Sequence, residues 1–243
     1  MGEDVLKDGL KTYFQKYSFK NTEYKDFIGE LAAAAERLNV TAVNLSEWAD
    51  EWLQSAGCSS FKLIAEEEGG KLKKLSVEQS LYNKENTPLN RLRTQRFQIA
   101  LLDENMDVVC VINATTSSTN AITEVDDPVA GMPTPAAYIL NYEGYGYGKF
   151  DYDDKCLKAF EQNLSKVESR DARKLIFCQL LDMIKSQAIS GGHLMKIMIK
   201  MLAAEPTEEN LLFCFVYLPM YINKSIPFEH MDKVKEDIVD TIL

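Results

Sequence analysis

The spacing of apolar residues changes twice along this chain of 243 residues. From the start to about residue 56, apolar side chains recur at the three- or four-residue interval of a helix face. From about 57 to 152 they alternate with polar residues in short runs, which is typical of half-buried β-strands. From about 153 onward the helical spacing returns. The sequence therefore predicts a multi-domain α+β fold with three successive parts.

The first part, residues 1–56, is expected to form a short helical segment. Its apolar stripes suggest helices around Val5–Tyr17, Tyr24–Ala35 and Trp48–Ala56. We expect Asn21–Thr22 and Ser46 to act as N-caps of the second and third helices, and Gly57 to end the third.

The second part, residues 57–152, is expected to form a small antiparallel β-sandwich of about seven short strands. Gly69–Gly70 and Asp103–Asn105 are interpreted as turns between strands. In the segment 145–152, Gly146 and Gly148 alternate with tyrosines. A dinucleotide-binding glycine motif opens a helix. Here alternation continues after the glycines, so we predict a twisted or bulged strand instead.

The third part, residues 153–243, is predicted to form an α-helical bundle or the start of an α-solenoid, and to be incomplete. Asp153 lies at the strand-to-helix junction, where negative charge favours a helix start. Ser169 is expected to cap the next helix. Pro219 is expected to kink or stop a helix that begins near Thr207, and Pro227 to occupy the first turn of the last one.

The charge balance excludes some classes of partner. The chain has 27 Lys and Arg against 37 Asp and Glu, a formal net charge of -10. A general nucleic-acid binder needs a basic surface that displaces counterions, so no nucleic-acid partner is expected. Adhesion to anionic membranes is disfavoured for the same reason. No apolar run approaches the roughly 18 residues of a membrane span, so we expect no membrane-spanning segment.

Two patterns point to different compartments. The five cysteines are odd in number and none forms a Cys-x-x-Cys spacing, which favours reduced thiols in the cytoplasm. Five Asn-x-Ser/Thr sequons leave a secretory or extracellular location open. They begin at Asn39, Asn44, Asn113, Asn163 and Asn223.

The chain lacks the motifs of the common catalytic centres. Its two histidines, His193 and His230, lie 37 residues apart, and neither belongs to a zinc-ligand spacing. His193 is interpreted as a polar residue at a helix start. Neither a Gly-x-Ser-x-Gly elbow nor a phosphate-binding loop occurs. We therefore expect no catalytic, cofactor-binding or metal residue in this chain.

Several segments in order resemble the later part of the zinc aminopeptidases related to aminopeptidase N and puromycin-sensitive aminopeptidase. Most specific is Gly146–Asp153, which is similar to that family's Gly-Tyr-Tyr-Arg-Val-x-Tyr-Asp strand. Here Gly148 replaces the second aromatic residue, and Lys149 stands where arginine is usual. The weaker likenesses lie before and after it, at Gly9–Phe14, Phe19–Thr22, Asp26–Phe27, Leu45–Trp48, Trp52, Gly57 and Ser169–Arg173.

The resemblance implies a structural role for this chain, with the catalytic residues of the family elsewhere. It makes residues 1–56 the helical tail of a catalytic-type domain, 57–152 the β-sandwich, and 153–243 part of the C-terminal helical domain. The family removes N-terminal residues from peptides with zinc, a base and a set of acidic residues. Their motifs include His-Glu-x-x-His and Gly-x-Met-Glu-Asn, and Gly131-Met132-Pro133 lacks the glutamate of the latter.

The resemblance thus predicts a non-catalytic fragment that is inactive alone and serves as scaffold and chamber wall. Zinc and peptide substrates would belong to the parent enzyme, and the missing catalytic portion would be a partner. The alternative is a stand-alone protein-interaction module descended from such an enzyme. An accidental likeness in an unrelated structural module is the third interpretation.

Overall fold

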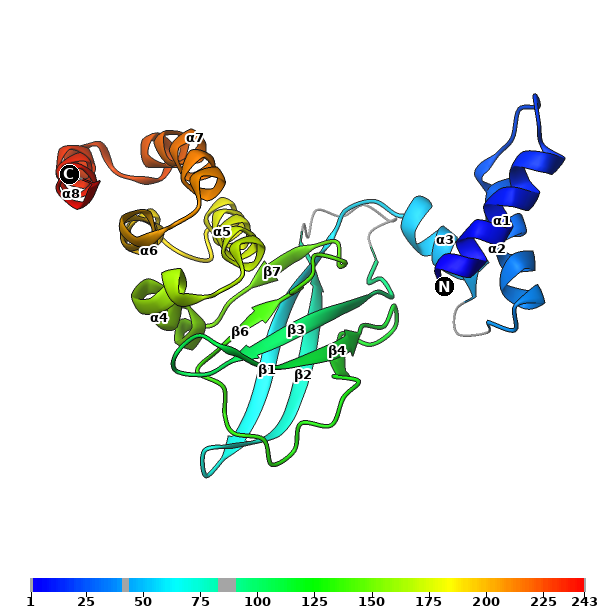
Figure 1. The fold of residues 1–243 in the computed structure, drawn as a ribbon, viewed down its shortest axis with the longest axis horizontal. Coiled ribbons are helices and arrows are strands. Elements are labelled where there is room, and N and C mark those ends of the chain that lie inside the picture. Colours follow the sequence, from blue (N-terminus) through cyan, green and yellow to red (C-terminus); the bar gives the residue numbers. More distant parts are fainter. Residues whose placement is uncertain (1, 41–43, 83–90, 243) are drawn as a thin grey trace.

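The structure is a computed structural model that describes residues 2–40, 44–82 and 91–242. Figure 1 shows a group of helices at each end of the chain and two small sheets between them. The predicted order of helices, strands and helices is confirmed. Within the described residues, no helix has the length and apolar character needed to cross a membrane.

The N-terminal helices are α1 (Glu3–Lys16), α2 (Tyr24–Arg37) and α3 (Leu45–Leu53). The predicted N-caps of α2 and α3 were wrong, and α3 ends at Leu53 with Gln54 as its C-cap, not at Gly57. α2 is capped by Glu23, which forms a reciprocal capping box with Asp26. α3 is capped by Asn44, whose side chain accepts from the backbone of Ser46 and Glu47. These helices enclose a small core of their own, formed by Val5, Ile28, Leu31, Ala34, Ala35, Leu45 and Ala49.

In the described part of the chain, seven strands build two sheets. Their bounds are β1 (Ser59–Glu68), β2 (Lys71–Leu81), β3 (Arg96–Leu102), β4 (Val108–Thr115), β5 (Ile122–Glu124), β6 (Ala137–Leu140) and β7 (Lys149–Asp151). One sheet has the order β5-β2-β1-β7 and the other β4-β3-β6. They pack face to face through edge-on and stacked rings of Phe61, Phe97 and Phe150, with centroids 5.0–5.3 Å apart.

The prediction that the whole second part is antiparallel was wrong. β7 pairs with β1 in parallel, with Phe61 opposite Phe150, so the four-stranded sheet is mixed. The chain reaches β7 from β6, which belongs to the other sheet. Apolar alternation records which face of a strand is buried and carries no information on the direction of its neighbour.

The glycine-rich segment before β7 is a loop, and the prediction of a strand from 145 was wrong. Asn141 adopts a positive φ of 57°, and Gly144 one of 76°, which turns the chain. The Asn141 amide then closes the loop by donating to the carbonyl of Gly146 and accepting from its N–H. This loop brings Gly148 against β1 with almost no space for a side chain.

Replacing Gly148 by alanine is expected to lower the free energy of unfolding by about 1–3 kcal/mol, because it overpacks a core site. A Cβ atom there would lie 2.5 Å from a ring carbon of Phe61 and 2.7 Å from the carbonyl oxygen of Ser59. Denaturant unfolding measures the effect. Gly192→Ala is the control, since its Cβ would meet nothing within 4 Å. Equal stability of both variants would contradict the packing of the loop on β1.

The C-terminal part contains α4 (Asp154–Asn163), α5 (Arg170–Lys185), α6 (Gly191–Ala204), α7 (Glu208–Ser225) and α8 (Met231–Ile242), with short 3-10 turns η1 (Leu164–Lys166) and η2 (Phe228–His230). Asp153 caps α4 and Ser169 caps α5, as predicted. Pro219 lies inside α7, which continues past it. Pro227 precedes η2 and does not open α8 directly.

One apolar core runs from the sheets into these helices. It includes Phe150 and Tyr152 from the end of β7 and Phe160, Phe177 and Ile197 from the helices. Figure 1 shows α4 and α5 beside β6 and β7, where this core crosses. The sheets and the C-terminal helices therefore stabilise one another. The core of α1–α3 is separate, and α3 meets the sheets through polar contacts and the edge-on ring contact of Trp52 with Tyr147.

Candidate functional site

The two histidines lie apart from any group of metal ligands. His193 is in the first turn of α6, as expected, with its Nε2 3.7 Å from Glu161 Oε2. His230 ends η2, with its Nε2 3.7 Å from Glu229 Oε1. Over the described ranges, no cluster of three or more His, Cys, Asp or Glu side chains could hold a metal ion.

All five cysteines are free thiols. Burial raises the pKa of Cys58 and Cys178, and it raises that of Cys156 well above the ordinary value. Burial, with Glu205 and Cys178 nearby, raises the pKa of Cys214 to about 12. Since the thiolate is the reactive form, these four groups are poor nucleophiles at neutral pH.

The joint between α3 and the sheets is built around Arg93. Its buried guanidinium donates to four backbone carbonyls that follow or end α3, those of Glu51, Ser55, Ala56 and Gly57. Its own backbone N–H donates to Gln79 of β2 over 3.0 Å. A cation near the C-terminus of a helix also interacts favourably with the negative end of the helix dipole. One side chain therefore fastens the last turn of α3 to the sheets.

Further contacts surround the same joint. Trp52 donates from its indole Nε1 to the carbonyl of Thr94, and the Arg93 guanidinium lies 5.2 Å from the Trp52 ring centre. The Thr94 N–H donates to Glu51 Oε2 over 3.0 Å. Trp48 and Trp52 do form one stripe, with ring centres 6.1 Å apart, as their spacing predicts. The sequence did not point to Arg93. Its main partners are backbone carbonyls, and no pattern of side chains predicts where these lie.

A second polar joint fastens β7. Lys149 and Asp151 form a salt bridge with side chains that are 7% and 6% exposed, and Ser60 of β1 donates to the same Asp151 carboxylate. The cavity beside this pair has a volume of about 390 Å³ and reaches α5 at Asp182 and Lys185. Asp151 is the last residue of β7, and its carboxylate helps to hold the parallel β1–β7 pair together.

The third joint lies within the C-terminal helices. Arg173 of α5 and Glu205 after α6 form a two-pronged salt bridge, with N–O distances of 2.7 Å and side chains 4% and 0% exposed. Arg173 also donates to the carbonyls of Val167 and Glu168, just before α5. Arg173 thus ties α5 and the segment just before it to the residue that follows α6.

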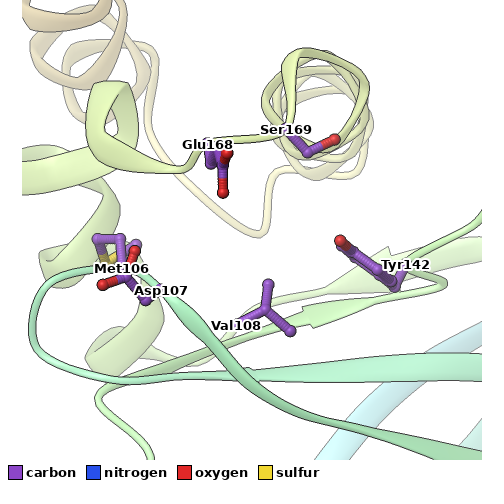
Figure 2. A pocket seen from close by; sticks show the side chains of 6 residues that line it. All are labelled: Met106, Asp107, Val108, Tyr142, Glu168 and Ser169. Carbon is purple, nitrogen blue, oxygen red and sulfur yellow. The ribbon is translucent and has the colours of Figure 1, made fainter.

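A cavity lies between the sheets and the start of α5. It has a volume of about 650 Å³ and is lined by Met106, Asp107, Val108, Tyr142, Glu168 and Ser169. Figure 2 shows Val108 and Tyr142 rising from the sheet side toward the segment that carries Glu168 and Ser169. A second hollow of about 430 Å³ shares Tyr142 and Ser169 and adds Glu143 and Asp171. Together they form an acidic groove along this junction.

No protein-family model matches this sequence, and no curated protein matches it.

Proposed function

We propose that this chain is a non-catalytic scaffold segment of a zinc-dependent aminopeptidase that removes N-terminal residues from peptides. The observation that carries the proposal is the succession of helices, two small sheets and helices in the order that the family resemblance implies. The three polar joints at Arg93, Lys149 and Arg173 support a structural role. At each joint, buried charged groups hold neighbouring segments together. The chemistry would come from a catalytic portion that carries the zinc ligands.

Apolar side chains exposed in the N-terminal part, on α1, in the loop after it and at the end of α3, support contact with such a portion. Phe14 is 65% exposed, Phe19 is fully exposed, and Leu53 is 58% exposed. Large apolar side chains left exposed are candidates for an interaction surface. In the proposed scaffold this surface meets the catalytic portion.

A direct biochemical test is the zinc content of the purified chain. We expect substoichiometric zinc by elemental analysis after dialysis, and no release of N-terminal residues from fluorogenic peptide substrates with added zinc. The reason is that the described residues bring no three suitable ligands together. Tight stoichiometric zinc, or zinc-dependent aminopeptidase activity, would contradict the non-catalytic assignment.

A stand-alone interaction module is the second candidate, and a stripe on α7 favours it. Leu212, Phe215, Val216 and Met220 recur at helical spacing and are 37–64% exposed. A native partner that co-purifies with this chain and carries no zinc-ligand motif would favour this candidate over the scaffold.

A further inference from the structure

One edge of the three-stranded sheet is open along part of β4. β4 is the outer strand, and Asn113 points its backbone groups away from β3. Its N–H donates to Asp127 Oδ2 over 2.6 Å, and its carbonyl accepts from the N–H of Asp126 over 2.8 Å. The alternation of an antiparallel ladder points the N–H and carbonyl of Val111 the same way. Among the described residues, neither group of Val111 has a partner on that side.

The side chains of this open edge are apolar. Val108, Val109 and Val111 are 40%, 59% and 39% exposed. Natural edge strands are usually protected by lysine, proline or inward charges, and the run from Val108 to Ile112 has none of these. The one protective feature is a bulge, because Leu101 faces Cys110 and Leu102 faces Val108, which leaves Val109 unopposed. Pairing with an added strand is therefore possible at Val111 and ends near Val109.

The acidic cavity begins where this open edge ends. Val108 is both the first residue of β4 and part of the cavity lining, together with Asp107 and Glu168 (Figure 2). Within the described chain, no lysine or arginine forms an ion pair with either carboxylate. A cationic side chain that follows a strand added at Val111 would reach uncompensated negative charge.

We propose that the β4 edge binds an extended basic peptide as an added strand, with a lysine or arginine of the peptide entering the cavity at Asp107 and Glu168. Backbone pairing at Val111 and contact with the exposed valines supply affinity, and the carboxylates supply selectivity. A second copy of this chain fits less well, because both copies carry a net charge of -10 and would bring two acidic grooves together. This inference is independent of the proposed scaffold function.

The test measures binding of fluorescent peptides to the whole chain at low salt. The probe alternates valine and threonine and ends in Lys-Lys, and its control ends in Glu-Glu. We expect the Lys-Lys probe to bind at least about tenfold more tightly than the control. Asp107→Asn combined with Glu168→Gln should remove most of that preference.

Two variants test the edge itself. Val111→Pro removes the outward N–H but no hydrogen bond between β4 and β3, so β4 is preserved. We expect the affinity for the Lys-Lys probe to fall at least about tenfold. Val109→Lys places a charge on the edge and should weaken the probe similarly. Val216→Lys, on an exposed valine of α7, is the control and should bind as the unmodified chain does.

Four results would overturn the proposal. They are no binding of the Lys-Lys probe, equal affinity for both peptides, binding unchanged in both edge variants, and a dimer in sedimentation that Val109→Lys dissociates. The last result would make a second copy the occupant of the edge.

Discussion

Replacing Arg173 by methionine is expected to lower the free energy of unfolding by about 3–5 kcal/mol, because it leaves a buried carboxylate without its cation. The Glu205 side chain is 0% exposed, and the Arg173 side chain supplies both of its short salt-bridge contacts. Denaturant unfolding measures the loss. The double variant Arg173→Met with Glu205→Leu should recover part of it, since the charge is then removed as well.

Arg170 provides the matched control on the same helix. It forms salt bridges with Asp171 and Glu209, but all three side chains are at least half exposed. Exposed pairs contribute about 0–1 kcal/mol, so Arg170→Met should change stability little. Equal losses for the variants at 170 and 173 would contradict a structural role for the buried pair.

The same pair has a defined pH dependence. Burial acts to raise the pKa of Glu205, but the hydrogen bonds from Arg173 and Thr207 outweigh it and hold the pKa below its ordinary value of 4.5. A carboxyl whose folded-state pKa is depressed contributes stability above its unfolded-state pKa and loses it as the pH falls through the folded-state value. The stability advantage of the unmodified chain over the double variant should therefore hold above pH 4.5 and shrink below it.

Replacing Arg93 by alanine is expected to detach α1–α3 from the sheets. The change removes a buried cation that donates to four carbonyls in the last turn of α3 and just after it, and each of these carbonyls loses that donor. Hydrogen bonds from charged donors contribute about 1.5–3 kcal/mol each and are not additive. We therefore expect the free energy that couples α1–α3 to the sheets to fall by at least about 3 kcal/mol. Hydrogen exchange should show faster opening of α3, with the core around Phe177 unchanged.

Arg96 is the control for this variant. It lies three residues further on, is exposed, and its Nε is 3.7 Å from Asp126 Oδ2. Arg96→Ala should leave exchange in α3 as it is. If Arg93→Ala also leaves it unchanged, the N-terminal helices are held by other contacts.

The sequence predicted those parts of the fold that depend on local pattern. The alternation around Phe61 and Leu75, with Gly69–Gly70 between them, marks the β1–β2 hairpin correctly. Asp153 and Ser169 were recognised as helix starts because a cap acts on the next few residues.

What the sequence did not reveal depends on partners far along the chain. The parallel pairing of Phe61 with Phe150 joins residues that are brought together only by a crossing between the two sheets. Arg93 binds backbone carbonyls, which have no sequence signature. Glu205 binds a single arginine that is distant in the sequence. The open edge at Val111 became visible only once β4 was known to be outermost.

The central proposal is that this chain serves as a scaffold for zinc chemistry carried elsewhere in a longer aminopeptidase. Sequencing the full-length transcript tests it most directly. We expect the same reading frame to encode a His-Glu-x-x-His motif followed by a further glutamate, upstream of Met1. An in-frame stop codon upstream with no such motif would contradict it.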